Sequence, residues 1–416
     1  MSASARSFGL VALFGLSATG ARLVADDQPV PAPKAPSATS AASTRFVAVR
    51  RGSEKDKALT REGGTAATEK AVEAGLEWLA RHQNEDGGWD ADGFSARCEK
   101  AGTACDGIGK GQHGEEMPCP FDAAISALAT LAFLGAGHGP WITDDRYATA
   151  VEKALARLES GGGDVWSLAL ATQALAEAEV MEGREHFSAA AKDGANRLLG
   201  GREQDGAWAY AGSFRAGSDV PFVGLVVPAL VAARDIGVAW PAGLANDVDR
   251  WLTSLETEHG RLAYVKDGRA YGYTPTTANG LSAAAIREWL EVGRETDRHH
   301  AHMGLARADP PDWTISFKEI DVKGRGKVKV QIGHLSLYEW WYGTMASFQA
   351  GGDPWRGWFA RLASALVPHQ RTDGCARGSW DPLGTYERQT GGRVFSTALC
   401  VQMLETPYRH RRLSGK

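Results

Sequence analysis

Two aspartates lie at the beginning of segments that consist mainly of small and apolar residues. Asp122 follows Cys119-Pro-Phe, Asp219 follows Gly217-Ser, and each opens a run with the composition of a buried helix. A carboxylate at such a position commonly accepts backbone N–H groups as an N-cap. A carboxyl that burial keeps protonated can instead donate a proton to a substrate. Asp122 and Asp219 are therefore the candidate catalytic residues, with capping as the alternative.

A dense group of aromatic side chains forms a second candidate site. Its members are His334, Tyr338, Trp340, Trp341 and Tyr342. Aromatic residues at this spacing cover too much of a helix to face one core, so some are expected to line a cavity. The alternative is that they pack between helix layers. An apolar cavity with a polar rim suits an isoprenoid, a fatty chain or an extended peptide.

The elements that must position these residues follow a repeat. Each unit has an amphipathic helix, a turn containing glycine and an aromatic residue, and a helix that is apolar on nearly all sides. In the first unit, Val72, Leu76 and Leu79 lie at helical spacing before a turn that ends at Trp89. The turn recurs at 161–166, 204–208, 260–264 and 370–380. A unit of this kind cannot bury its apolar faces alone.

Six segments have the character of the second, fully apolar helix. They begin near Asp122, Ser167, Asp219, Thr277, Ser336 and Ser396. Helices buried on all sides make an inner layer, and helices with one apolar stripe make an outer layer. The sequence therefore predicts an all-α protein, a single (α/α)6 toroid over 64–412 with six inner and about six outer helices. A β-hairpin insertion is expected near 314–332, as a functional appendage or a surface decoration.

The amino-terminal segment has the layout of an export signal. Arg6 precedes an apolar run over 8–16 that is too short to span a membrane, and small residues follow it. We expect a signal peptide over 1–25, export to the periplasm or the extracellular space, and no transmembrane span after its removal. Residues 26–63 are expected to form a disordered tether, because the first part is rich in Pro, Ala and Ser.

The charge balance argues against one class of partner. The chain has 46 basic and 50 acidic residues, for a net charge of −4, so no basic field favours nucleic acid. At 43% apolar residues the chain has material for a large core.

The repeated turns carry a family resemblance. The segments 83–89, 204–208 and 370–380 resemble the QW repeats of squalene-hopene cyclases, in the terpene cyclase/prenyltransferase repeat superfamily. In this interpretation Gln bonds backbone groups of a neighbouring turn and Trp stacks on the adjacent repeat. The resemblance covers roughly 64–412. Members of this superfamily have different activities, so the fold does not choose a reaction.

The resemblance implies two enzymatic alternatives. Class II cyclases use an Asp-x-Asp-Asp motif, which is absent here and leaves Asp122 and Asp219 as the only carboxylates proposed for that role. Asp373-Gly-Cys375 is similar to the Asp-x-Cys zinc ligands of prenyltransferase β subunits, but Ser396 stands where their His ligand is expected. Ring closure could also bring Cys119 to Cys375, as a disulfide or at a metal.

The remaining expectations concern the thiols and the overall function. If the chain is exported, Cys98 and Cys105 are expected to form a disulfide across a short loop. We expect an exported toroid that binds an apolar or isoprenoid-like ligand or a peptide in its central cavity, without cyclase activity and without a cofactor. The alternatives are a terpene cyclase with an Asp general acid, and a zinc-dependent transferase-like site at Asp373 and Cys375. The sequence does not indicate an oligomeric state.

Overall fold

A computed structural model describes the chain over residues 47–48, 50–98, 104–107, 109, 119–161, 163–210, 218–257, 261–263, 277–292, 311–314, 317–322, 326–331 and 336–413. All of these belong to one unit, Ser37–Lys416. The expected signal peptide over 1–25 and the first part of the tether lie outside the described residues, as do His334 and most of the segment between 292 and 311.

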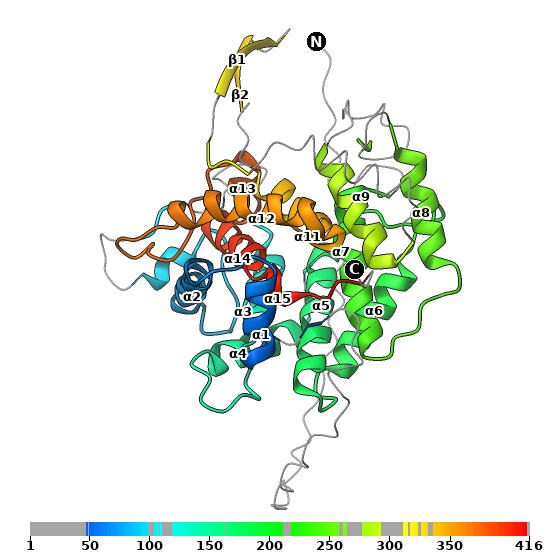
Figure 1. The fold of residues 1–416 in the computed structure, drawn as a ribbon, viewed down its shortest axis with the longest axis horizontal. Coiled ribbons are helices and arrows are strands. Elements are labelled where there is room, and N and C mark those ends of the chain that lie inside the picture. The colour runs from blue at the N-terminus through cyan, green and yellow to red at the C-terminus, as the bar shows by residue number, and fades with distance from the viewer. Residues whose placement is uncertain are drawn as a thin grey trace, which may run out of the picture. The chain divides into compact units, whose positions relative to one another are not determined.

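Six helices form a closed inner ring (Figure 1). They are α3 (Asp122–Ala136), α5 (Val165–Glu182), α7 (Val220–Asp235), α9 (Thr277–Leu290), α11 (Leu337–Ala350) and α14 (Gly392–Leu404). Each contacts the next in this order, and α14 contacts α3. Nearly every residue of α3 and α14 is buried, as expected for helices with neighbours on all sides. The predicted (α/α)6 toroid is confirmed.

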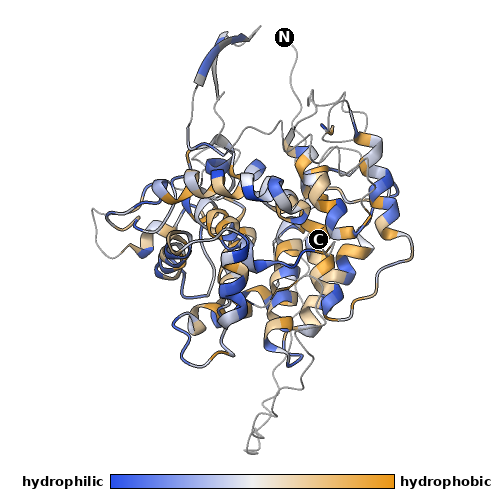
Figure 2. Cartoon of the chain, viewed as in Figure 1, coloured by the Kyte–Doolittle hydropathy of each residue, from blue (hydrophilic) through white to orange (hydrophobic). Residues whose placement is uncertain are grey.

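Outer helices pack against this ring. They are α2 (Ala66–Arg81), α4 (Ala148–Glu159), α6 (Ser188–Gly200), α8 (Leu244–Leu255) and α12 (Gly352–Leu366). In α8 the buried residues are limited to one stripe, which includes Val248, Trp251 and Leu255. Figure 2 shows this contrast between hydrophobic inner helices and outer helices with a hydrophilic side.

Shorter elements complete the described chain. They are α1 (Gly52–Arg61), η1 (Phe94–Arg97), η3 (Val367–His369), α13 (Thr385–Thr390), α15 (Thr406–Arg409), β1 (Phe317–Val322) and β2 (Gly326–Gln331). The strands β1 and β2 pair antiparallel, which confirms the predicted hairpin. The prediction of a disordered tether over 26–63 is wrong for the last part of that range, because residues 52–61 form the helix α1. None of the described helices combines the length and apolar content that crossing a bilayer requires.

The Gln side chains of the first and last repeated turns bind the backbone as expected, and the Trp side chains of the turns donate to the backbone as well. Gln83 donates to Gly87 O and to Ala150 O on α4, both at 2.9 Å. Trp89 Nε1 donates to Leu79 O at 2.8 Å, a carbonyl in the last turn of α2. In the third repeat Arg202, and not Gln204, donates to the equivalent Gly206 O. Each turn therefore satisfies backbone carbonyls of neighbouring segments.

The last of these turns closes the ring. Gln370 donates to Ala71 O on α2 and to Gly378 O, both at 2.8 Å. Gly378 has a φ of +94°, and a Cβ there would lie 2.1 Å from Ala74 O. Only glycine allows so close an approach in this left-handed conformation. The turn over 370–380, here called the closing turn, thus docks the last repeat onto the first.

A buried ion network lies at the carboxyl-terminal ends of the inner helices. Arg50 donates to Leu134 O, near the end of α3, and pairs with Glu177 at 2.7 Å. Arg409 pairs with Glu177 and with Glu405. All four side chains are almost fully buried. The chain segments at 47–50 and 405–410 therefore cover this end of the ring, and the opposite end holds the groups described next.

Candidate functional site

Three carboxyl groups gather where α3 begins, and we call them the acidic triad: Asp90, Asp92 and Asp122. Ala91 N–H donates to Asp122 Oδ1 at 2.9 Å, and Cys119 N–H donates to Asp92 Oδ2 at 2.7 Å. Burial and a side-chain hydrogen bond to Asp92 raise the pKa of Asp90. Burial, with Asp90 and Asp92 nearby, raises the pKa of Asp122 to about 6. The triad can therefore hold a proton at near-neutral pH.

Asp164 and Asp219 occupy the equivalent starts of α5 and α7. Asp164 Oδ1 accepts Ser167 N–H at 2.9 Å and Asp219 Oδ1 accepts Phe222 N–H at 2.9 Å, so both are N-caps. The second oxygen of Asp219 accepts Tyr210 N–H at 3.2 Å. The predicted catalytic residue Asp219 thus has a capping role, and it is only 4% exposed.

Aromatic side chains connect the beginnings of the inner helices. Phe121 packs against Trp166 with ring centroids 5.1 Å apart. Tyr210 hydrogen-bonds Asp164 through its hydroxyl group. Burial and this hydrogen bond raise the pKa of Tyr210, and Tyr386 and Asp219 raise it further. These contacts, with the bond from Tyr210 N–H to Asp219, link the starts of α3, α5 and α7.

Tyr386 completes this arrangement. Its ring lies 5.5 Å from that of Tyr338 and 6.0 Å from that of Phe395, which places it among α11, α13 and α14. It is the exposed large hydrophobic side chain of the described residues, at 45%. A tyrosine that contacts two rings and still presents surface is suited to stack on a ligand.

The predicted aromatic binding group is divided by the structure. Trp340, Trp341 and Tyr342 are buried, and Trp341 packs against Trp289 of α9. The Tyr342 hydroxyl donates to Pro221 O at 3.2 Å, which ties α11 to α7. Tyr338 is the described member of the group that packs against the exposed Tyr386. For the three buried members, packing between helices accounts for the aromatic character.

A separate cluster brings together His82, Cys98, Cys105 and Cys375. The His82 Nε2 atom lies 3.6 Å from the Sγ atoms of Cys98 and Cys105, and 3.4 Å from that of Cys375. All four ligand atoms lie within 4.8 Å of one another. Burial raises the pKa of the Cys105 thiol to about 12. Such a set of three thiols and one imidazole could hold a metal ion.

This cluster revises the expectations for the cysteines. Cys98 and Cys105 converge as predicted, but as free thiols and not as a disulfide. Cys375 belongs to the cluster, whereas Asp373 points away, 75% exposed and paired with Arg371 at 3.2 Å. Cys119 lies elsewhere and donates its thiol to Thr390 O at 3.3 Å. The expected Asp373–Cys375 ligand pair is therefore replaced by a different set.

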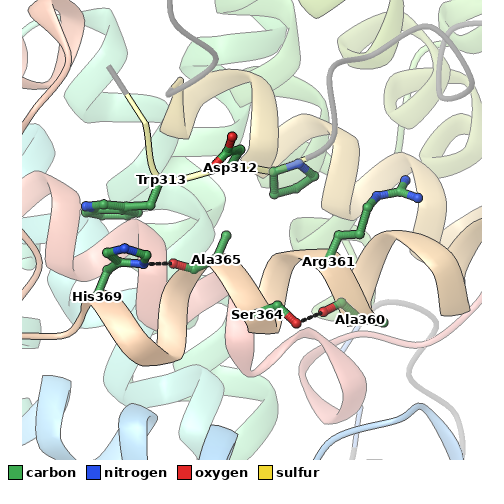
Figure 3. A pocket seen from close by; sticks show the side chains of 8 residues that line it. Asp312, Trp313, Ala360, Arg361, Ser364, Ala365 and His369 are labelled. Carbon is green, nitrogen blue, oxygen red and sulfur yellow. Dashed lines mark hydrogen bonds between the residues drawn. The ribbon is translucent and has the colours of Figure 1, made fainter. Parts of the chain in front are cut away.

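A surface pocket of about 380 Å³ lies beside α12 (Figure 3). Trp313 and His369 stack there with centroids 5.6 Å apart, and Asp312 and Arg361 are exposed to solvent. Neither this pocket nor a smaller groove of about 200 Å³ between α4 and α6 includes Asp122, Asp219 or the thiol cluster.

Four residues of these sites were not predicted from the sequence: His82, Asp90, Asp92 and Tyr386. His82 directly precedes Gln83 of the first repeated turn, and Asp90 and Asp92 directly follow its Trp89. Their proximity to a turn that must dock on the next repeat was the available signal. No pattern in the sequence marks Tyr386.

Comparisons with known proteins support the fold. No family model and no curated protein sequence matches the chain. An inactive variant of the GH76A alpha-1,6-mannanase of Salegentibacter sp., solved with alpha-1,6-mannotriose, is similar in structure with a TM-score of 0.55 and 12% identity, over 82% of this chain and 99% of that one. The type II terpene cyclase MstE from Scytonema matches with a TM-score of 0.50 and 14% identity, over 82% and 97%. At these identities the likeness shows a shared (α/α) toroid fold alone.

Proposed function

We propose that the protein binds a neutral, hydroxylated ligand of the oligosaccharide type at the amino-terminal ends of its inner helices, and that Asp122 donates a proton to it. The observation that carries this proposal is the position of Asp122, a partly exposed carboxyl group that Ala91 N–H holds beside Asp90 and Asp92 at the start of α3. Burial raises the pKa of this group to about 6. General acids work best when their pKa lies near the working pH.

The other groups at this end of the ring favour a sugar over a hydrocarbon. Asp122 Oδ1 is bound by Ala91 N–H, and among the described residues no hydrogen bond to Oδ2 is seen, so this oxygen is the one proposed to meet a ligand. Tyr386 offers an exposed aromatic face, and the ring of Tyr338 lies 5.5 Å from it. Aromatic faces with nearby carboxylates suit pyranose rings, whereas an isoprenoid chain needs a dry apolar wall. This proposal replaces the expected apolar or peptide ligand.

The two similar toroids are consistent with either ligand class, since one is a mannanase and the other a terpene cyclase. Protonation of a glycosidic oxygen and protonation of an alkene both require a carboxylic acid that stays protonated. The acid-dependent terpene reaction is therefore the second candidate, supported by the same Asp122.

The test is binding by isothermal titration calorimetry with the full chain, using alpha-1,6-mannotriose and a panel of neutral oligosaccharides, with geranylgeraniol in detergent as the alternative probe. We expect an oligosaccharide to bind and Tyr386→Ala to weaken its binding at least tenfold. Asp122→Asn is expected to preserve binding and abolish turnover of the bound oligosaccharide. The matched control is Asp193→Asn, because Asp193 is exposed on the outer helix α6. Binding of geranylgeraniol alone would overturn the assignment of ligand class.

A further inference from the structure

The thiol cluster has the dimensions of a tetrahedral metal site. A zinc ion with Zn–S of about 2.3 Å and Zn–N of about 2.0 Å holds its nitrogen and sulfur ligands roughly 3.5 Å apart. The three distances from His82 Nε2 to Sγ atoms are 3.4 to 3.6 Å. The distances from the nitrogen to each sulfur therefore match those of such a tetrahedron, and all four ligand atoms lie within 4.8 Å of one another.

The imidazole of His82 is oriented for metal binding. Its Nδ1 lies 2.8 Å from Trp78 O, and because a carbonyl only accepts, Nδ1 carries the proton. Nε2 then carries the free lone pair and lies within 3.6 Å of all three sulfur atoms. The ring stacks on Trp78 at 4.3 Å and meets Phe94 edge-on at 5.9 Å, and His82 is fully buried. A hydrogen bond from the second ring nitrogen and an apolar shell are typical surroundings of a histidine ligand.

The sulfur ligands are also supported by the backbone. Cys105 N–H donates to Cys98 Sγ at 3.2 Å, a bond that fixes the position of this sulfur atom. Arg81 donates to Cys375 O at 3.4 Å and to Arg377 O at 2.9 Å, which anchors the closing turn beside the cluster. Two of the thiols are partly exposed, so an ion has a route in.

The closing turn is longer than the first repeated turn, and its extra length contributes to this site. In the first turn, Gln83 donates to the carbonyl of Gly87, four residues later. In the closing turn, Gln370 donates to the carbonyl of Gly378, eight residues later. The longer loop contains Cys375. The extra residues therefore reach across the junction between the last and first repeats.

We propose that His82, Cys98, Cys105 and Cys375 bind a structural zinc ion that fastens the last repeat of the toroid to the first. Four protein ligands leave no open coordination position, so the site is structural and separate from the acidic triad. Three thiols and one imidazole in a tetrahedron select zinc over the harder divalent cations.

The experiment measures metal content of the full chain purified under reducing conditions without chelator, by inductively coupled plasma mass spectrometry. We expect one zinc ion per chain, loss of most of it in Cys375→Ser, and full retention in Cys119→Ser, which removes a thiol outside the cluster. The same samples are compared by thermal unfolding with and without a chelator. Chelator should lower the Tm of the unmodified chain and of Cys119→Ser, and leave that of Cys375→Ser unchanged.

A second measurement avoids dependence on a variant that fails to fold. Cobalt(II) replaces zinc in the unmodified chain, and its visible spectrum should show thiolate charge transfer and the strong ligand-field bands of tetrahedral coordination. A six-coordinate cobalt spectrum, iron in place of zinc, or a metal-free protein with a Cys98–Cys105 disulfide by peptide mapping would each overturn the proposal.

Discussion

The side-chain amide of Gln370 donates to Ala71 O at 2.8 Å and so joins positions 299 residues apart in the chain. With Gly378 O as its second acceptor, this one amide satisfies backbone carbonyls in both the last and the first repeat. Ring closure therefore depends on polar contacts as well as on the packing of α14 against α2 and α3.

Removing that amide should weaken the ring at its junction. Gln370→Ala leaves two carbonyls without their donor, so we expect the free energy of unfolding to fall by about 1–3 kcal/mol. Urea denaturation followed by circular dichroism measures this. Gln204→Ala is the matched control, because Gln204 is exposed, and its effect should stay within about 0.5 kcal/mol. Equal effects of the two changes would contradict the role assigned to Gln370.

Asp219 should prove to be a structural residue. Asp219→Ala removes the acceptor of Phe222 N–H and of Tyr210 N–H, and a lost N-cap costs about 1–2 kcal/mol of stability. Asp219→Asn keeps one carbonyl oxygen and should cost less. Thermal and urea unfolding compare the two variants. If Asp219→Asn instead leaves stability intact and abolishes a measured activity, Asp219 is catalytic.

Arg50 should be essential to the covered end of the ring. Arg50→Met leaves the buried Glu177 with Arg409, at 3.5 Å, as its remaining guanidinium partner. Breaking one side of a buried ion pair costs about 3–5 kcal/mol. Arg51→Met, at an exposed neighbouring position, is the control and should be nearly neutral. A small effect of Arg50→Met in urea unfolding would show that the ion pair between Arg50 and Glu177 contributes little to stability.

Acid should remove the contribution that Glu177 makes to this network. Burial opposes ionisation of Glu177, but Arg50 and Arg409 together hold the pKa of its carboxyl below the usual value. A carboxyl with a lowered folded pKa contributes stability above its unfolded pKa and loses that contribution as pH falls through the folded pKa. We therefore expect the free energy of unfolding to fall less on acidification in Glu177→Gln than in the unmodified chain.

Asp122 should make the stability of the protein depend on pH in the opposite direction. Its pKa is about 6 in the folded protein against an ordinary value of 3.8, so the folded state binds its proton more tightly. The resulting stability is complete below the unfolded pKa and is lost as pH rises through the folded value. Urea unfolding at about pH 4 and about pH 7 should show a smaller decrease with pH for Asp122→Asn than for the unmodified chain. An identical pH profile would show that the Asp122 pKa is ordinary.

The sequence by itself determined the layers of this protein. Local periodicity fixes what each helix must bury. It is seen in the stripe of Val248, Trp251 and Leu255 and in the largely apolar run that follows Asp122. The hairpin over 317–331 likewise follows from strand and turn residues that are neighbours in the chain. The repeat then implied a closed ring, because no unit buries itself alone.

Only the tertiary structure decided which polar groups meet. His82 and Cys375 lie 293 positions apart, and no periodicity relates them. The structure also assigned Trp340, Trp341 and Tyr342 to packing between helices, and gave the role expected of Gln204 to Arg202. Such outcomes depend on the register in which one repeat docks on the next, and that register is set by side-chain packing across the ring and not by the spacing of residues along the chain.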